Sequence, residues 1–116
     1  MPSETEILQR LYQRFNARDI PAVLTLLHQD VMWANGMEGG HVHGHEGVRD
    51  YWTRQWAMID PSVAPDAFSK RADGTVEVTV HQTVRDLKGR ILSDKMVRHI
   101  FRMQEGLITR FDIGQA

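Results

Sequence analysis

The N-terminal part of the chain carries apolar residues at helical spacing. The residues that recur every three or four positions are Ile7, Leu8, Leu11, Tyr12 and Phe15. Ser3 and Glu6, three positions apart, form a capping box directly before this run. The pattern predicts an amphipathic helix over residues 4–17.

Two further helices are predicted before residue 61. Asp19 is a suitable N-cap for a short leucine-rich helix that ends near Asp30, where His28 would interact favourably with the helix C-terminus. A strand over 31–35 and a glycine-rich loop over 36–44 are expected next. The third helix is predicted over 45–59 from a single apolar stripe, namely Val48, Tyr51, Trp52, Trp56 and Ile59.

From residue 61 onward the apolar period changes from helical spacing to two. Strands are predicted near 63–72, 75–85, 90–103 and 107–113, and the short segments between them have hairpin-turn composition. Helices therefore precede an antiparallel meander, which is typical of an α+β fold with three N-terminal helices packed on a curved antiparallel sheet. Because no linker or shift of composition interrupts the chain, we expect one domain over residues 1–116.

The register of the central hairpin can be argued from its turn. If Arg85 faces Arg90, then Val76 faces His99 and Val80 faces Lys95. The inward face would then consist of Val76, Val78, Val80, Gln82, Val84, Ile91, Val97, His99, Phe101 and Met103.

On the outer face, the same register sets Glu77 opposite Arg98 and His81 opposite Asp94, two favourable charge pairs. The alternative with Asp86 opposite Arg90 would place Val78 against Arg98 and is rejected for that reason.

Charge and composition exclude several functional classes. The formal net charge is -1 and the 14 basic residues are scattered, so we expect neither a nucleic-acid partner nor a membrane partner. The chain has no cysteine, which excludes a thiolate nucleophile and a disulfide. No signal peptide or long apolar segment is evident, so a cytoplasmic location is expected.

The order of these elements resembles the nuclear transport factor 2-like superfamily, which includes ketosteroid isomerases and polyketide cyclases. The best matches are the Asn-Ala-Arg-Asp junction at Asn16–Asp19 and the helix start at Gly44–Trp52. The resemblance implies a cone with a pocket between the helices and the concave sheet face. It also implies a small, mostly apolar ligand and a homodimer formed through the outer sheet face.

The catalytic acids of those relatives are not retained at the matching positions. Asn35 stands where ketosteroid isomerases carry their aspartate base, and His99 stands where they carry a protonated aspartate. Their oxyanion-hole tyrosine falls on Leu11, beside Tyr12. The inward acid of the epoxide-opening relatives is matched by Ile113.

His99 is the pocket residue that titrates near neutrality, and it is the candidate general acid or base, with Asn35 or Gln82 as a hydrogen-bond donor. The alternative is a core histidine satisfied by a neighbour. The expected pocket residues are Tyr12, Phe15, Trp33, Met37, Trp52, Trp56, Val78, Val80, Gln82, Val97 and Phe101.

A second cluster of candidates lies in the glycine-rich loop. His41, His43 and His45 alternate along the chain and would share one side of an extended segment, with Glu38 near enough to join them. Zinc binding is one interpretation, and solvated loop histidines are the other. We expect no cofactor and favour the second interpretation.

Three functions are compatible with these residues. The first is an enzyme that transfers a proton on a small apolar carbonyl compound through His99, in an isomerase, cyclase or dehydratase type of reaction. The second is a non-catalytic ligand-binding domain, and the third is a dimerisation module whose pocket is filled by its own side chains.

Overall fold

The computed structural model describes residues 3–115 and contains three helices and one six-stranded sheet. The helices are α1 (Glu4–Asn16), α2 (Ile20–Leu24) and α3 (Gly44–Met58). The strands are β1 (Leu27–Ala34), β2 (His41–His43), β3 (Asp60–Lys70), β4 (Val76–Arg85), β5 (Ile91–Gln104) and β6 (Leu107–Gln115). The expected α+β class is confirmed.

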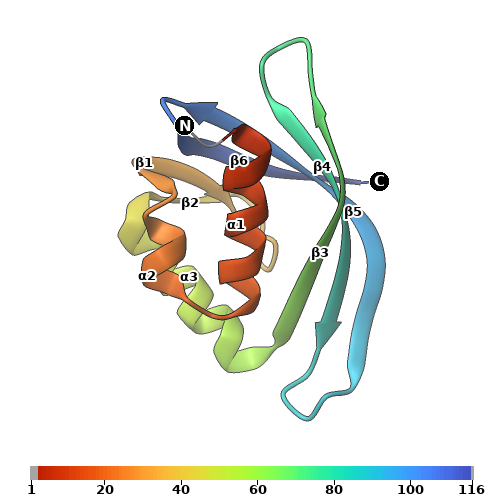
Figure 1. Cartoon of the computed structure of the whole chain (residues 1–116). Helices are drawn as coiled ribbons and strands as arrows, with labels where there is room; N and C mark the ends of the chain where they lie inside the picture. Colours follow the sequence, from red (N-terminus) through yellow and green to blue (C-terminus); the bar gives the residue numbers. More distant parts are fainter. Residues whose placement is uncertain (1–2, 116) are drawn as a thin grey trace.

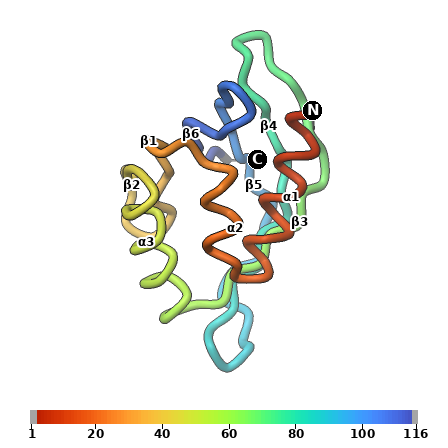
Figure 2. Tube along the Cα trace, turned by 60° about the vertical axis from the view of Figure 1, so that its left-hand side comes forward, coloured from red at the N-terminus to blue at the C-terminus, as the bar shows by residue number. Residues whose placement is uncertain are grey.

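The sheet has the strand order β2-β1-β6-β5-β4-β3. Its long strands curve strongly, and the three helices lie on the concave side (Figure 1). When the molecule is turned by 60°, α2 lies between α1 and α3 (Figure 2). The predicted meander from β3 to β6 is confirmed, and β1 adds to it in parallel with β6.

The local signals at the helix starts act as predicted. The Ser3 hydroxyl accepts the Glu6 backbone N–H at 3.1 Å, which completes the capping box of α1. The Asp19 carboxylate accepts the Ala22 N–H at 3.2 Å and caps α2. These bonds satisfy amide groups that a helix start leaves unpaired.

Two segments differ from the sequence expectation. α2 ends at Leu24, and β1 already begins at Leu27, so the expected strand over 31–35 is longer and His28 lies on a strand. Pairing of Leu27 with Ile108 across the sheet overrides the local helical pattern. Residues 41–43, expected in a loop, form the edge strand β2 against β1.

The hairpin of β4 and β5 has a different register and keeps the predicted faces from Ser93 onward, whereas Ile91, expected inward, lies opposite Arg85 and is 53% exposed. Val78 lies opposite His99 and Val80 opposite Val97, two positions away from the expected pairing. A slip of two residues leaves each side chain on the same face of the sheet. Gln82, Val97, His99 and the neighbouring apolar residues therefore still point inward.

A β-bulge explains why the register prediction was wrong. At the turn, the Asp86 N–H donates to the Arg90 carbonyl at 2.8 Å, which is the pairing that the sequence argument rejected. Leu92 is an extra residue on β5 between the last regular pair and the turn, so the register changes there. The sequence argument rejected the pairing of Asp86 with Arg90 because it assumed one register along the whole hairpin.

The outer-face charge pairs form diagonally instead of directly across the strands. Glu77 Oε1 lies 3.5 Å from Arg98 Nη1, and His81 contacts the carboxylate of Asp94. Long side chains bridge the two-residue offset, so these contacts could not distinguish the two registers.

The core lies between the helices and the concave sheet face. Its largest fully buried side chains are Trp52, Phe101, Leu8, Ile108, Val23, Val31, Val48, Val78 and Val80. Burial of each contributes about 1.5–3 kcal/mol relative to exposure. Within the described residues, no helix is long and apolar enough to cross a membrane.

Candidate functional site

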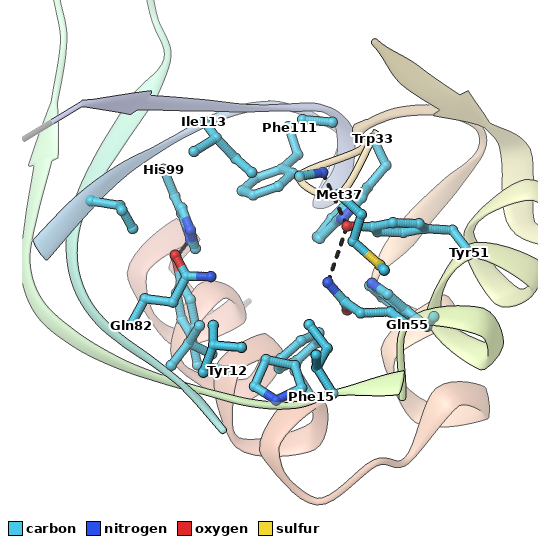
Figure 3. Close-up of a pocket in the computed structure, with 18 of the residues that line it drawn as sticks. Tyr12, Phe15, Trp33, Met37, Tyr51, Gln55, Gln82, His99, Phe111 and Ile113 are labelled. Atoms are coloured by element: carbon cyan, nitrogen blue, oxygen red, sulfur yellow. Dashed lines mark hydrogen bonds between the residues drawn. The ribbon is translucent and has the colours of Figure 1, made fainter. Parts of the chain in front are cut away.

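A cavity of about 420 Å³ opens between the helices and the sheet. Its walls come from α1, β1, α3 and the four strands of the meander, and the side chains of each point into it (Figure 3). Most of the lining is aromatic or aliphatic. The lining side chains with polar groups besides Trp33 and Trp52 are Tyr12, Tyr51, Gln55, Gln82, Ser93, Lys95 and His99.

Tyr12 and His99 form a hydrogen-bonded pair on the inner wall. The Tyr12 hydroxyl lies 2.8 Å from His99 Nδ1. Both side chains are almost fully buried, with relative exposures of 4% and 7%. α1 supplies the tyrosine because position 12 falls on its apolar stripe, and β5 supplies the histidine from its inward face.

Both members of this pair are held in their neutral forms. Burial lowers the pKa of His99 to about 4. Burial also raises the pKa of the Tyr12 hydroxyl well above its usual value. At neutral pH the pair therefore consists of an imidazole and a phenol.

The hydrogen bond favours one tautomer of the imidazole. The Tyr12 O–H has no other acceptor among the described residues, so it stays paired only if it donates to Nδ1 of His99. The ring proton then resides on Nε2. In this tautomer His99 has an N–H group left to donate to a bound molecule.

Aromatic rings hold the histidine in place. The ring of Phe111 meets His99 edge to face at 4.8 Å and stacks on Trp33 at 4.2 Å. Trp33 in turn meets Trp52 edge to face at 5.3 Å. These contacts form a rigid, flat-sided wall suited to aromatic ligands.

Most of the expected pocket residues lie on the cavity wall. Those that the structure brings together there are Tyr12, Phe15, Trp33, Met37, Trp52, Gln82, Val97, His99 and Phe101. Val78 and Val80 are fully buried in the core and do not reach the cavity. Trp56 is also outside the lining and stacks on Trp52 at 5.7 Å.

Asn35 is engaged by its own loop. Its Oδ1 accepts the backbone N–H groups of Met37 at 3.0 Å and Glu38 at 2.9 Å. The side chain is absent from the cavity lining. Asparagine commonly binds the amides that follow it in turns, and this local bond keeps Asn35 from acting as the pocket donor that was expected.

Two of the three alternating histidines have separate partners, and the third, His43, is exposed. His41 Nε2 lies 2.8 Å from Asp112 Oδ1, and His45 Nε2 lies 2.9 Å from the Leu27 carbonyl. Residues 3–115 contain no group of three or more His, Asp or Glu side chains arranged to hold a metal ion. Asp112 also binds Arg110 at 2.8 Å.

Sequence reasoning missed two polar residues of α3. Tyr51 and Gln55 lie one helical turn apart, and both line the cavity. The Tyr51 hydroxyl accepts the Gly36 N–H at 3.0 Å and the Gln55 amide at 3.1 Å. A signal was available, because Gln55 interrupts the apolar stripe of this helix with a polar side chain.

Among residues 3–115, no carboxylate lies on the cavity wall. Lys95, on β5, is its one charged side chain when His99 is neutral. Ile113 lines the cavity at the position where the epoxide-opening relatives place an acid. The arrangement can donate hydrogen bonds to a ligand oxygen, and it lacks a carboxylate base.

These features agree with one protein family. The model of the SnoaL-like domain matches residues 8–111. The chain belongs to the SnoaL-like domain family. The expected membership of the nuclear transport factor 2-like superfamily is thereby confirmed. No curated protein matches this SnoaL-like domain significantly.

Solved structures support the same fold. TerC, co-crystallised with polyporic acid, is 27% identical with a TM-score of 0.84, covering 97% of this chain and 90% of TerC. A nuclear transport factor 2-like protein of unknown function from Burkholderia pseudomallei is 27% identical with a TM-score of 0.85, covering 100% and 92%. A proposed polyketide cyclase from Pseudomonas putida is 23% identical with a TM-score of 0.79, covering 100% and 93%, and this likeness shows the fold alone.

Proposed function

We propose that this SnoaL-like domain binds a small, largely apolar carbonyl compound in the cavity and transfers a proton on it through His99. The observation that supports this most directly is the buried hydrogen bond of 2.8 Å between Tyr12 and His99 on the cavity wall. Nε2 of His99 has no hydrogen-bond partner among the described residues, so the ring keeps one nitrogen for a ligand at the cavity wall.

The neutral imidazole first acts as a hydrogen-bond donor. Its Nε2–H can polarise a ligand carbonyl, while the Tyr12 hydroxyl fixes the tautomer from the other side of the ring. Gln82 lies beside His99 (Figure 3) and can supply a second donor. Negative charge that develops on the carbonyl oxygen is then stabilised by two groups.

The low pKa of His99 results from its burial among apolar groups. Nε2 cannot accept a proton while it carries one, so abstraction uses the other tautomer, in which Nδ1–H donates to the Tyr12 oxygen and the bare Nε2 takes the ligand's α-proton. The enolate formed beside the imidazolium is its counter-ion and raises its pKa again, and Nε2 then returns the proton to another atom of the ligand. Proton transfer between the ligand and His99 is therefore favourable only as the ligand becomes anionic. This coupling is suited to an isomerisation, cyclisation or dehydration that passes through an enolate.

The charge of the wall favours neutral or anionic ligands. None of the described lining residues is a carboxylate that could pair with a cation, and Lys95 is positive. Ligands with acidic enols or carboxylates are favoured over amines.

A direct test uses two probes. Polyporic acid, the molecule co-crystallised with TerC, tests binding through quenching of the fluorescence of Trp33 and Trp52. 2-Tetralone tests proton transfer, because exchange of its α-protons with D₂O is followed by NMR. We expect exchange above the buffer rate, reduced by about 10²–10⁴-fold in His99→Gln.

The non-catalytic alternative makes a different prediction from the same experiment. The missing carboxylates are the observation that favours it. A wild-type protein that binds polyporic acid and does not accelerate exchange supports a ligand carrier and contradicts catalysis. If His99→Gln does not change the affinity for polyporic acid and the wild-type protein does not accelerate exchange of 2-tetralone, His99 has a role in neither binding nor catalysis.

Dimerisation through the outer sheet face is part of the same proposal. Met96 is 41% exposed there. Sedimentation velocity tests this, with Met96→Glu expected to dissociate the dimer. A wild-type monomer at high concentration contradicts it.

The cytoplasmic location stays a prediction that cell fractionation can check.

A further inference from the structure

The wall formed by α3 holds polar groups that lack partners. Tyr51 is 3% exposed, and its hydroxyl lies against Gly36 and Gln55. The Oε1 atom of Gln55 is buried without a hydrogen-bond partner. Figure 3 shows this pair on the opposite side of the cavity from His99 and Tyr12.

Counting protons shows what the pair can offer. The Tyr51 oxygen accepts two N–H groups, which uses both lone pairs and leaves its own O–H without an acceptor among the described residues. If the Gln55 amide is turned round, the Tyr51 O–H donates to it and the amide N–H₂ is left free instead. In either orientation at least one donor remains unpaired beside the cavity.

Such unpaired groups are costly in an apolar site. A buried donor or acceptor without a partner destabilises a fold by about 1–3 kcal/mol. The Gly36 N–H donates to the Tyr51 oxygen at 3.0 Å, so the hydroxyl is positioned before any ligand arrives. Burial also raises the pKa of the Tyr51 hydroxyl, which keeps it protonated and able to donate.

We propose that Tyr51 and Gln55 form a second polar subsite, which binds a hydroxyl or carbonyl oxygen at the end of the ligand remote from His99. The inference rests on the proposed function, because it assumes that the ligand occupies this cavity. It narrows the ligand to a class. The favoured molecule is a rigid aromatic compound with an oxygen substituent at each end, and its flat middle lies against Trp33 and Phe111.

Two matched probes test the subsite. 2-Acetylnaphthalene has one polar end, and 6-hydroxy-2-acetylnaphthalene has two and is otherwise identical. We expect wild-type protein to bind the hydroxylated probe about three- to tenfold more tightly in a calorimetric titration, which corresponds to one net hydrogen bond. In Gln55→Leu and in Tyr51→Phe, the two probes should bind with about equal affinity.

The variants are chosen to separate folding from binding. Tyr51→Phe also removes the acceptor for Gly36, whereas Gln55→Leu keeps that contact and a similar volume. If Tyr51→Phe does not fold, Gln55→Leu alone therefore tests whether the subsite binds the hydroxyl of the probe. His99→Gln is the matched control from the opposite wall, and it should weaken both probes while the preference for the hydroxyl remains.

The outcomes distinguish the two proposals. Equal affinities of wild-type protein for the two probes, or a preference that survives Gln55→Leu, overturn the subsite and leave the proposed function standing. If wild-type protein binds neither probe nor polyporic acid, the proposed function itself fails and the subsite fails with it.

Discussion

The hydroxyl of Tyr12 and Nδ1 of His99 lie 2.8 Å apart, although 87 positions separate the two residues along the chain. The bond connects the helical layer to the sheet at the inner wall of the cavity. The Tyr12 O–H is satisfied only while Nδ1 of His99 accepts it, so protonation of the imidazole must break this arrangement and put a cation among aromatic rings. Stability and proton chemistry are therefore coupled at this pair.

The first prediction concerns pH. The pKa of His99 is about 4 in the folded protein, below the ordinary value of 6.5 that applies when the chain is unfolded. The unfolded chain binds the proton more tightly, so the contribution of His99 to stability is complete above pH 6.5 and is lost as the pH falls towards 4. Between these values the free energy of unfolding should fall by about 1.4 kcal/mol per pH unit from this residue.

Urea unfolding of wild-type protein and His99→Gln across this pH range measures the effect. The other five histidines are present in both proteins, so the difference between their slopes isolates residue 99. Parallel slopes for the two proteins would show that His99 is protonated as easily in the fold as in the unfolded chain.

The second prediction concerns Tyr12→Phe. The substitution keeps the ring in the core and removes only the hydroxyl, which leaves Nδ1 of His99 buried without its partner. We expect a loss of about 1–3 kcal/mol in the free energy of unfolding. We also expect a mixture of imidazole tautomers, read from the ¹⁵N shifts of the ring. A single unchanged tautomer in the variant would contradict the role given to Tyr12.

The third prediction concerns Asn35→Asp, which restores the residue type of the ketosteroid isomerases at this position. The new carboxylate should accept the same two N–H groups, from Met37 and Glu38, and stay outside the cavity. We therefore expect no gain in the exchange rate of 2-tetralone. We also expect a small loss of stability, because the amide that donates to Glu38 Oε1 at 3.4 Å becomes a second carboxylate. An increase of tenfold or more would show that the side chain can turn towards the ligand.

The fourth prediction concerns the one cation of the cavity wall. Lys95→Gln should weaken binding of 2-naphthoate by about two- to fivefold, because an exposed ion pair contributes less than about 1 kcal/mol. Affinity for neutral 2-naphthol should not change. The loss should disappear at high salt, whereas an equal loss for both probes would mean that Lys95 contributes packing and not charge.

The sequence predicted the faces of the sheet better than its pairing. Alternation places Gln82, Val97 and His99 inward in both the expected and the observed register, since a slip of two residues preserves the face. The bulge at Leu92 has no sequence signature of its own, because Leu92 is compatible with a regular strand. Register near the turn was therefore not predictable from apolar spacing.

The candidate site was predictable only where side-chain direction follows secondary structure. His99 and Tyr12 sit on regular elements with one buried face, and both reached the cavity as expected. Their hydrogen bond depends on the packing of α1 against β5, which spacing within either element does not encode. Asn35 lies at a strand end, where a local turn decided its direction.

β6 lies between β1 and β5 in the sheet although it is the last strand in chain order. Before residues 107–115 leave the ribosome, the hairpin of β1 and β2 has no hydrogen-bonded link to the meander. Pairing of strands that lie far apart in the sequence is slow. Until it occurs, the edges of β1 and β5 carry unpaired backbone N–H and C=O groups. The cavity is thus completed late in the synthesis of the domain, and until then the edges of β1 and β5 are the places where two unfinished chains would join.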